Sequence, residues 1–505
     1  MICMFEAGMG TAFMEAYAFY PEILITEDER KGIAMNESVN RRAFMGATGT
    51  ALSLGMGGCA TLPARQDWAV AAAVPEGGIH SLVEQTPLMD THEHLPPESK
   101  RVKAVDDKDD VPAPDFGMLF SHYADSELRV AGMPEEAYRK MIGRKLSPKE
   151  KWKLVAPYYG RCRHTGYLLN VRESVCALYG EEDIREDNCE EISRRLRADI
   201  QPGFYRKILR DVANIEHAQI NCLQSPIYRE SEAPDDLLSF DLTTVNIATG
   251  INRKVLRECA GAEVTTLKMA HETIDKVFEK YGGKAIAVKD QCAYGRRLNF
   301  EDVPDNEAEP LFMRFAAKED LTAQETKALQ DNLFRRCVRL AAEYNLPIKL
   351  HTGYAAGHDS MDLSRVRDNL CDVSRLAHDF PETRFVLMHM AYPYQHELIA
   401  LCKQYSNIYA DMCWAWIIDP ASATQFLKAF IMAAPACKLC TFGGDYIPVE
   451  LVPGHARIAR RGITLAITQL LTEGWLRESD APALIDRIMR GNAHELYDLK
   501  RVFKG

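Results

Sequence analysis

The chain has 505 residues, of which 47% are hydrophobic and 26% are charged, so it can bury a large core and is neither disordered nor fibrous. Its 72 acidic residues outnumber its 61 lysines and arginines, giving a formal net charge of −11 that argues against a nucleic-acid partner. No run of about 18 consecutive apolar residues occurs, so we expect no membrane-spanning helix.

Residues 1–58 have the layout of an export signal. Arg41 and Arg42 precede an uncharged, weakly apolar run, as in a twin-arginine signal. The run ends in Met-Gly-Gly-Cys, similar to a lipoprotein cleavage box, so Cys59 is a candidate lipid anchor. The segment before Met35 is unusual ahead of such a signal, which makes Met35 the preferred start. We expect a bacterial periplasmic protein or membrane-anchored lipoprotein; the alternative is a glycine-rich loop behind a chance arginine pair.

The chain contains 14 cysteines, and Cys437 and Cys440 form its single C-x-x-C pair. No second pair stands at zinc-finger distance and no thioredoxin-like pattern surrounds it, so we predict a structural role for both sulfurs. The spacing of the cysteines leaves disulfide pairing open.

From residue 88 onward, short apolar runs alternate with helical patterns. Eight runs are typical of buried strands: Leu88–His94, Ile215–Leu223, Leu238–Asn246, Lys284–Asp290, Pro347–His351, Phe385–His389, Asn407–Asp411 and Leu439–Asp445. Helical patterns cover Ala323–Tyr344, Ser374–Asp379, Gln395–Tyr405, Ala421–Ala433 and Ile463–Trp475. Strands that alternate with helices pair in parallel, and eight of them predict an α/β fold, a (β/α)8 TIM barrel formed within residues 59–505.

Residues 95–201 interrupt this alternation after the first strand. The segment is too long for a loop and too polar to supply core strands, so we predict a helical insertion over the C-terminal mouth of the barrel. It either helps to close the pocket or mediates oligomerisation.

Histidine or aspartate ends four of the predicted strands. His92 and His94 lie on the same side of the first strand, because side chains alternate along a strand. His351, His389 and Asp445 end three later strands. Strand ends of a barrel converge on one mouth, so the sequence predicts a metal site there.

These residues carry a family resemblance. The chain resembles the metal-dependent amidohydrolase superfamily, and within it the nodulin-like and uronate-isomerase-like branch. The resemblance is strongest from Lys284 to Arg460, and its landmarks are Ala287–Asp290, Ala293–Arg296, Leu350–Tyr354, Met388–Tyr394, Asn407–Asp411 and Phe442–Asp445. Barrels of this branch often form homo-oligomers.

The resemblance implies specific roles. His92, His94, His351 and Asp445 would bind a divalent metal, and His389 would lie at a second metal or contact the substrate. Asp445 would also accept and return a proton as general base and acid. Zn²⁺ is the first choice for imidazole and carboxylate ligands, with Mn²⁺ or Fe²⁺ as alternatives and one or two ions per chain.

Lys289, at the end of the fourth strand, has three interpretations. It matches the lysine that is carbamylated and bridges two metals in binuclear members. In members with a single metal it would contact an anionic substrate as a catalytic residue. An ordinary salt bridge, for example with Asp290 or with an acidic neighbour across the mouth, is the third interpretation.

Several residues after the strand ends are candidates for shaping the pocket. Tyr294, Tyr392, Tyr394, Trp414 and Trp416 are aromatic, with packing beneath the loops as their alternative role. Arg296 and Arg457 suggest a carboxylate on the substrate, with a surface ion pair as the alternative.

The sequence therefore predicts a metal-dependent hydrolase that cleaves a C–N or C–O bond of a small, carboxylate-bearing molecule. The alternative on the same scaffold is a uronate-isomerase-like isomerase or a decarboxylating lyase. A third hypothesis is an exported binding protein without turnover, which would require a disrupted ligand set.

Overall fold

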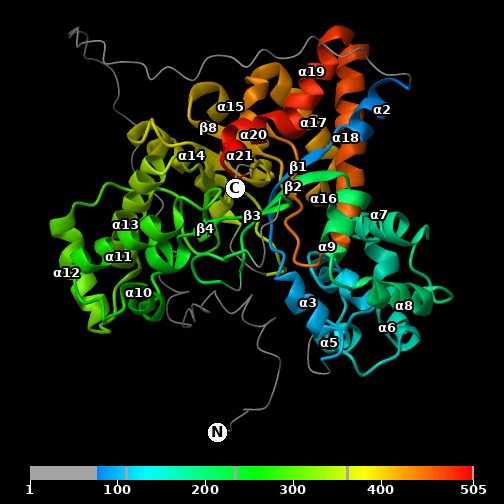
Figure 1. The fold of residues 1–505 in the computed structure, drawn as a ribbon, viewed down its shortest axis with the longest axis horizontal. Helices are drawn as coiled ribbons and strands as arrows, with labels where there is room; N and C mark the ends of the chain where they lie inside the picture. Colours follow the sequence, from blue (N-terminus) through cyan, green and yellow to red (C-terminus); the bar gives the residue numbers. More distant parts are fainter. Residues whose placement is uncertain (1–76, 108–111, 224, 232–235, 360–362, 503–505) are drawn as a thin grey trace, which may run out of the picture.

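The computed structural model describes residues 77–502 except 108–111, 224, 232–235 and 360–362. The predicted export signal and lipid-anchor site lie outside the described residues. Nine strand segments run through the centre of the molecule (Figure 1): β1 (Leu88–Glu93), β2 (Ile215–Ile220), β3 (Leu238–Phe240), β4 (Leu242–Thr243), β5 (Val288–Asp290), β6 (Ile348–Leu350), β7 (Phe385–Leu387), β8 (Ile408–Asp411) and β9 (Leu439–Cys440).

The nine segments make eight barrel strands. β3 and β4 are separated only by Asp241, whose N–H donates to the Ile220 carbonyl of β2, while the Leu242 N–H donates to the Ala287 carbonyl before β5. One strand thus passes from the sheet β1-β2-β3 to the sheet β4-β5-β6-β7-β8-β9, and every pairing is parallel.

Backbone hydrogen bonds join the chain after β9 to β1. The Thr91 N–H donates to the Phe442 carbonyl at 3.1 Å, and the Asp445 N–H donates to the His92 carbonyl at 2.8 Å. Each of the eight predicted strand regions contains an observed strand, and the barrel prediction is confirmed.

The helices after β2 surround the barrel. They are α10 (Arg253–Ala260), α11 (Leu267–Tyr281), α12 (Asp305–Ala316), α13 (Ala323–Glu343), α14 (Ser364–Asp379), α15 (Gln395–Gln404), α16 (Ala415–Ile418), α17 (Pro420–Ala433), α18 (Val452–Thr472), α19 (Ala481–Asp486), α20 (Asn492–Leu496) and α21 (Leu499–Val502). A capping box of Thr322 and Glu325 begins α13, close to the predicted boundary. α14 and α18 begin about three turns before their predicted starts, and α18 has a proline in its first turn, where proline is tolerated.

The segment between β1 and β2 is helical. It contains α3 (Glu98–Ala104), α4 (Ala124–Val130), α5 (Glu135–Ile142), α6 (Pro148–Cys162), α7 (Gly166–Tyr179), α8 (Cys189–Asp199) and α9 (Phe204–Arg206), while α2 (Gly78–Gln85) precedes β1. These helices form one side of the molecule in Figure 1. α7 packs closely on α18, since a Cβ at Gly454 would lie 2.4 Å from the Asn170 carbonyl oxygen.

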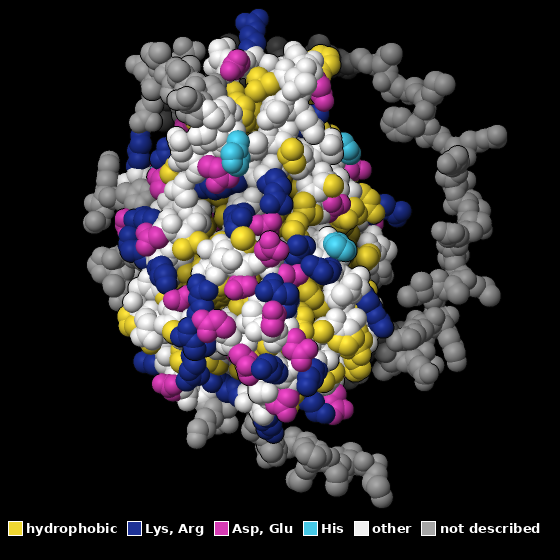
Figure 2. Space-filling view, turned by 90° about the vertical axis from the view of Figure 1, so that its right-hand side faces the viewer, with side chains coloured by type: hydrophobic (Ala, Val, Ile, Leu, Met, Phe, Trp, Pro, Cys, Tyr) yellow, Lys and Arg dark blue, Asp and Glu magenta, His cyan; other side chains and the backbone are white. Residues whose placement is uncertain are grey.

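Two observations concern the charges on the surface and the length of the helices. On the face shown in Figure 2, basic and acidic side chains are intermingled. Among the residues that the structure describes, no helix is both long and apolar enough to cross a bilayer.

Candidate metal centre and active site

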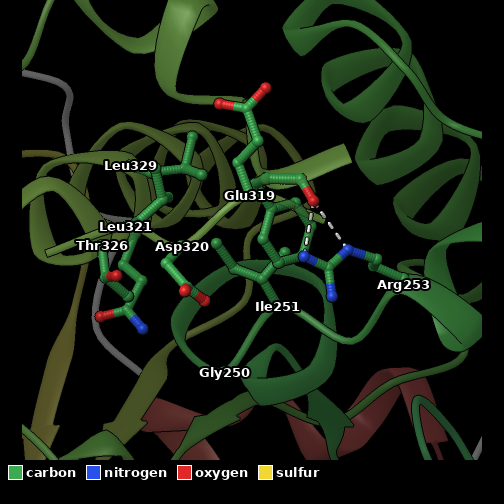
Figure 3. A pocket seen from close by; sticks show the side chains of 10 residues that line it. Gly250, Ile251, Arg253, Glu319, Asp320, Leu321, Thr326 and Leu329 are labelled. Atoms are coloured by element: carbon green, nitrogen blue, oxygen red, sulfur yellow. Dashed lines mark hydrogen bonds between the residues drawn. The ribbon is translucent and has the colours of Figure 1, made fainter. Parts of the chain in front are cut away.

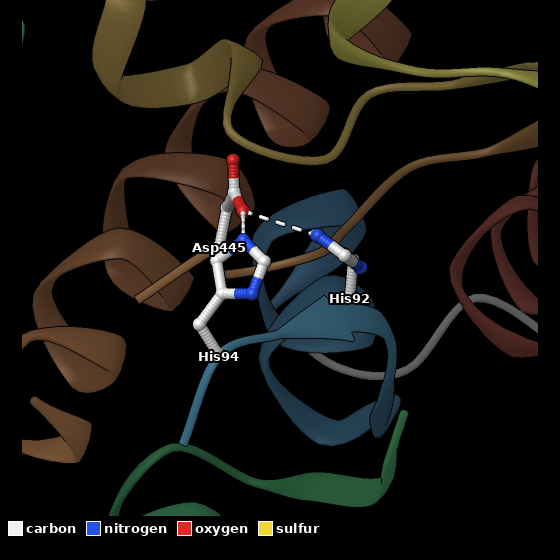
Figure 4. A group of neighbouring side chains, drawn as sticks. All are labelled: His92, His94 and Asp445. Carbon is white, nitrogen blue, oxygen red and sulfur yellow. Dashed lines mark ion pairs between the residues drawn. The ribbon is translucent and has the colours of Figure 1, made fainter. Parts of the chain in front are cut away.

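Two imidazoles from β1 and its end converge on one carboxylate. The Nε2 atoms of His92 and His94 lie 3.2 Å and 3.0 Å from Asp445 Oδ1 (Figure 4). His92 and Asp445 are buried, and His94 is only slightly exposed. Strand alternation brings the two histidines together, as predicted, and the closing of the barrel brings Asp445 to them.

Acidic side chains of β1 accept hydrogen bonds from the backbone on both sides of Asp445. Its own backbone has φ of 61°, which is unusual for a residue with a side chain. The flanking N–H groups bond to two buried acids: Gly444 donates to Asp90 Oδ1 at 3.2 Å and Tyr446 donates to Glu93 Oε2 at 2.6 Å. We call Asp90 and Glu93 the acid clamp. It requires glycine at 444, where a Cβ would lie 1.8 Å from Glu93 Oε1.

The acid clamp holds protons more tightly than ordinary carboxyl groups. Burial raises the pKa of Asp90 to about 7 and that of Glu93 well above its usual range, with their mutual repulsion adding to the shift of Glu93. Such groups can remain buried without a cation of their own, because a protonated carboxyl avoids most of the desolvation cost.

A second acid supports His92 from inside the barrel. Asp241 Oδ2 lies 3.8 Å from His92 Nδ1. The buried Lys349 Nζ donates to both oxygens of Asp241, at 2.9 and 3.0 Å, and to the Thr91 carbonyl at 2.8 Å. Burial alone would raise the pKa of Asp241, but Lys349 outweighs it and the pKa is lowered, so this acid stays charged.

The other two histidines contact each other. His389 Nε2 and His351 Nδ1 are 2.9 Å apart, and His351 Nε2 lies 2.9 Å from the Tyr354 carbonyl oxygen. His389 Nδ1 faces Asp445 Oδ2 at 3.9 Å and the Cys413 Sγ at 3.6 Å. His351 therefore lies beyond His389 and outside the cluster of His92, His94 and Asp445, unlike in the predicted ligand set.

Burial keeps the core histidines neutral. Desolvation lowers the pKa of His92 to about 4 and that of His389 to about 3. Neutral imidazole is the form that binds metals.

Lys289 is buried beside these groups. Its Nζ lies 2.8 Å from Met388 Sδ, and burial lowers its pKa, opposed by the charge of Asp445. Asp290 accepts hydrogen bonds from the hydroxyls of Thr244 and Thr249 instead of pairing with Lys289. The structure thus gives no support to the interpretation as a salt bridge with Asp290.

The candidate pocket residues fall into two sets: aromatic residues close to His351 and His389, and residues that pair or pack elsewhere. The Tyr294 ring packs against His351 with centroids 4.6 Å apart, and the Trp414 ring meets His389 edge-on at 5.2 Å. Tyr392 follows the loop of His389 and packs near Tyr354.

The two arginines have other partners. Arg296 pairs with the buried Asp331 of α13 and donates to Gln330 at 3.0 Å. Arg457 lies on α18 and pairs with Glu173 of α7 at 3.2 Å. Trp416 donates its indole N–H to the Thr441 carbonyl and packs on α18 beside Gly462. These contacts match the alternative roles of structural pairing and packing, and the structure does not bring either arginine into the histidine cluster.

The helical insertion contributes residues that the sequence did not reveal. The Tyr123 hydroxyl donates to the Asp445 carbonyl at 2.6 Å, and its ring stacks on Trp414. His122 accepts a hydrogen bond from the Ile447 N–H at 3.3 Å and interacts electrostatically with Asp445 and His94. No sequence signal places this part of a long insertion at the mouth. Glu93, by contrast, stands visibly between the two β1 histidines.

The residues present fit a divalent cation. His92 Nε2 lies near Asp445, yet neither ring nitrogen of His92 has a well-formed hydrogen bond within the described part of the chain. Ligand atoms of His92, His94 and Asp445 all lie within 4.8 Å of one another, as do those of His389, Cys413 and Asp445. Two imidazoles and a carboxylate form a donor set that suits zinc and similar ions.

One hollow lies apart from the site. A hollow of about 180 Å³ beside α10, α12 and α13 is lined by residues that include Gly250, Ile251, Arg253, Glu319, Asp320 and Leu329 (Figure 3). It shares no lining residue with the histidine cluster.

All cysteines among the described residues are free, including the exposed Cys437 and the buried Cys440.

Comparison with known proteins supports the resemblance seen in the sequence. The amidohydrolase family profile matches residues 307–499. Protein fluG of Emericella nidulans is 29% identical over 226 residues, which cover 42% of this chain and 26% of fluG. The chain thus spans about a quarter of the length of that curated relative.

Solved structures share the fold along most of the chain. Glucuronate isomerase from Caulobacter crescentus is 18% identical with a TM-score of 0.67, covering 83% of this chain and 93% of that chain. Uronate isomerase from Thermotoga maritima is 16% identical with a TM-score of 0.65, covering 83% and 96%. A protein from Lactobacillus casei assigned as a metal-dependent hydrolase is 16% identical with a TM-score of 0.60, covering 84% and 98%.

At these identities the structural likeness concerns the fold, while the family profile concerns the sequence of the C-terminal barrel half. The two agree with the convergence of histidines and aspartate at one barrel mouth. Residues 307–499 thus match the amidohydrolase family profile, and the chain shares its fold with these solved structures.

Proposed function

We propose that this protein is a metal-dependent hydrolase that cleaves a C–N or C–O bond in a small, carboxylate-bearing substrate. The observation that carries the proposal is the position of Asp445, whose Oδ1 faces two imidazoles while its Oδ2 faces a third. One carboxylate can therefore contact a cation and still offer an oxygen to a reacting proton.

In this proposal, His92, His94 and Asp445 hold the metal. A bound divalent ion would make water more acidic and polarise a substrate carbonyl. Asp445 accepts the proton of the attacking water and returns it to the leaving group. Its pKa lies well below the usual value because His92 and His94 outweigh the effect of burial, so the carboxylate is ionised.

The surrounding residues hold His92 and Asp445 in place and exclude water from them. The acid clamp fixes the backbone on both sides of Asp445. Asp241, which accepts a hydrogen bond from Lys349, supports His92. Tyr123 and Trp414 cover Asp445 and His389 with aromatic surface. Exclusion of water strengthens each electrostatic interaction in the pocket.

The metal would be measured first. Elemental analysis of purified protein is expected to find at least one divalent ion per chain, with zinc as the leading candidate and manganese or iron as alternatives. Intact mass of Lys289-containing peptides, under conditions that preserve a carbamate, tests the bridging role of this lysine. Two ions with a modified lysine favour a bridging role; one ion with an unmodified lysine favours contact with substrate.

Turnover would be tested with a panel of N-acyl amino acids, lactones and related carboxylates. The Asp445→Asn variant should be inactive while folded, with Asp236→Asn as a control because Asp236 is an exposed acid that pairs with Arg206 and Arg210. An Asp445→Asn protein that retains full activity would falsify the proposal.

A sugar-acid isomerase is the second candidate. Two observations favour it: the fold is shared with two uronate isomerases along most of each chain, and the insertion places His122 and Tyr123 beside Asp445. These two residues offer further acid and base groups for moving a proton between carbons. Product analysis in ¹⁸O-labelled water separates the two candidates, because hydrolysis places a solvent oxygen in the product and intramolecular hydrogen transfer does not require it.

We also propose that residues 1–58 direct export through a twin-arginine pathway. The support is the arginine pair followed by an uncharged run. Replacement of Arg41 and Arg42 by lysine should retain the protein in the cytoplasm of a bacterial host. Intact mass of the exported form shows whether Cys59 is lipidated, and unchanged export of the double variant would contradict the proposal.

A further inference from the structure

The hollow beside α10, α12 and α13 is lined by charges of both signs that do not pair with each other. Asp320 lies in the link between α12 and α13, and Arg253 begins α10. Neither forms an ion pair within the described part of the chain. Glu319 pairs with Arg314 at 3.4 Å, and in Figure 3 its side chain points away from Asp320. The hollow therefore offers one carboxylate and one guanidinium to a ligand.

The Arg253 guanidinium is held in a fixed position. Its Nε and Nη2 atoms donate to the Phe315 carbonyl at 2.8 and 2.5 Å (dashed lines in Figure 3), and its Cζ lies 4.0 Å from the centre of the Phe315 ring. Among the described residues, Nη1 has no acceptor. Because the group is already ordered, a ligand that binds Nη1 incurs little entropic cost for ordering it.

The rest of the lining combines apolar surface with polar atoms. Ile251 and Leu329 are buried. The Thr326 hydroxyl and the Gln330 side-chain nitrogen have no hydrogen-bond partner in the part of the chain that the structure describes. Ile251 has φ of 32°, which is unusual for a β-branched residue. Such backbone persists only where its surroundings fix it, so the apolar wall is also held in place.

The size of the hollow restricts the ligand to a small molecule. Its volume of about 180 Å³ is below the roughly 300–1,000 Å³ of sites that take drug-sized ligands. A molecule that matches this lining has a compact apolar part, one anionic group and one cationic group. A metal ion matches it poorly, because the guanidinium would repel the ion.

We propose that this hollow binds an apolar α-amino acid of the size of leucine. The carboxylate of the ligand accepts from Arg253 Nη1, its ammonium donates to Asp320, and its side chain contacts Ile251 and Leu329. Charge-assisted hydrogen bonds of this kind are stronger than neutral ones. A ligand with only one of the two charges leaves the other charge of the hollow without a partner.

The proposed site is distinct from the barrel mouth but adjoins one of its loops. Gln330 accepts a hydrogen bond from Arg296 at 3.0 Å, and Arg296 lies two residues after Tyr294, whose ring packs on His351. None of the lining residues belongs to the cluster of histidines and Asp445. The inference therefore concerns binding only and holds whichever reaction the protein catalyses.

The test is isothermal titration calorimetry of the full-length protein with leucine. Wild type is expected to bind one leucine per chain. Two analogues each lack one charge: 4-methylpentanoate has no ammonium, and 3-methylbutylamine has no carboxylate. Each should bind roughly tenfold more weakly or worse, because it loses a hydrogen bond to a charged group. This comparison uses wild-type protein alone, so it decides the question even if a variant fails to fold.

Variants then locate the bound leucine. Arg253→Met and Asp320→Asn should each weaken binding by a similar factor. Arg257→Met is the matched control, one turn further along α10, where Arg257 pairs with the exposed Glu263. Asp445→Asn should bind leucine as wild type does, which separates the hollow from a product bound at the mouth.

Four results would overturn the proposal. They are the absence of leucine binding to wild type, equally tight binding of either analogue, unchanged binding by folded Arg253→Met and Asp320→Asn, and loss of binding in folded Asp445→Asn.

Discussion

Asp445 lies between two pairs of histidines that the chain builds differently. His92 and His94 come from one strand, two residues apart, and both direct Nε2 at the same carboxylate oxygen. His351 and His389 come from different strands and contact each other, so only His389 faces Asp445. A pair within one strand shares a face through the alternation of the strand, whereas a pair from two strands depends on loop conformation as well.

The difference extends to the backbone that presents each pair. The β1 histidines lie in or directly after a regular strand. His389, Met390 and Ala391 have φ values of 63°, 43° and 51°, and Trp414 opposite has 65°. Left-handed backbone at non-glycine residues is costly and persists where surrounding contacts fix it, which is typical of functional sites.

The largest expected effect comes from the carboxylate shared by both pairs. Asp445→Asn removes the proton acceptor, and loss of a general base costs roughly 10²- to 10⁴-fold in kcat. Asparagine tolerates left-handed backbone, so the fold should persist. Steady-state kinetics and circular dichroism of the variant, beside wild type and Asp236→Asn, measure the two effects separately.

The second-largest expected effect is on metal content, which substitutions in the two histidine pairs should change differently. His92→Asn should remove the ion held by the β1 pair, because it deletes a ligand. His351→Asn should leave that ion in place, since His351 contacts His389 and the Tyr354 carbonyl instead. Elemental analysis after dialysis gives the result, and equal loss of this ion in both variants would contradict the contrast between the pairs.

The acid clamp should have an intermediate effect. Glu93→Gln keeps an acceptor for the Tyr446 N–H but places an amide in the tight space beside Gly444. Because outer partners of metal sites are worth roughly 10- to 100-fold, we expect a loss of that size in metal affinity. Competition with a chelator measures it, and Asp241→Asn offers the matching test on the His92 side. Unchanged affinity in both variants would show that the support residues do not position the ligands.

The smallest effect concerns an ion pair outside the site. Burial would raise the pKa of Glu216, but His494 and Arg490 outweigh it and lower the pKa to about 2. A lowered carboxyl pKa stabilises the fold above the ordinary value of 4.5, and this contribution is lost as pH falls through about 2. Glu216→Gln should therefore reduce the difference in Tm between pH 6 and pH 3 without changing metal content. An identical pH dependence in wild type and variant would contradict this assignment.

The sequence determined the barrel and much of its mouth. Eight apolar runs separated by helical patterns indicated the strands, because parallel strands buried on both faces are continuously apolar. His92 and His94 were identifiable as partners because side chains of a strand alternate. Asp445 and His389 were identifiable because they follow strand ends that meet at one mouth.

Tertiary structure alone decided what those residues touch. The bonding of His351 to His389, the pairing of Arg296 with Asp331 and the approach of Tyr123 to Asp445 join segments far apart in the chain. Residue type does not distinguish a substrate-binding arginine from one in a structural ion pair, since both require a nearby anion. Spacing indicates which strand ends share a mouth, but the orientation of each side chain there depends on loops and on an insertion with no periodic signal.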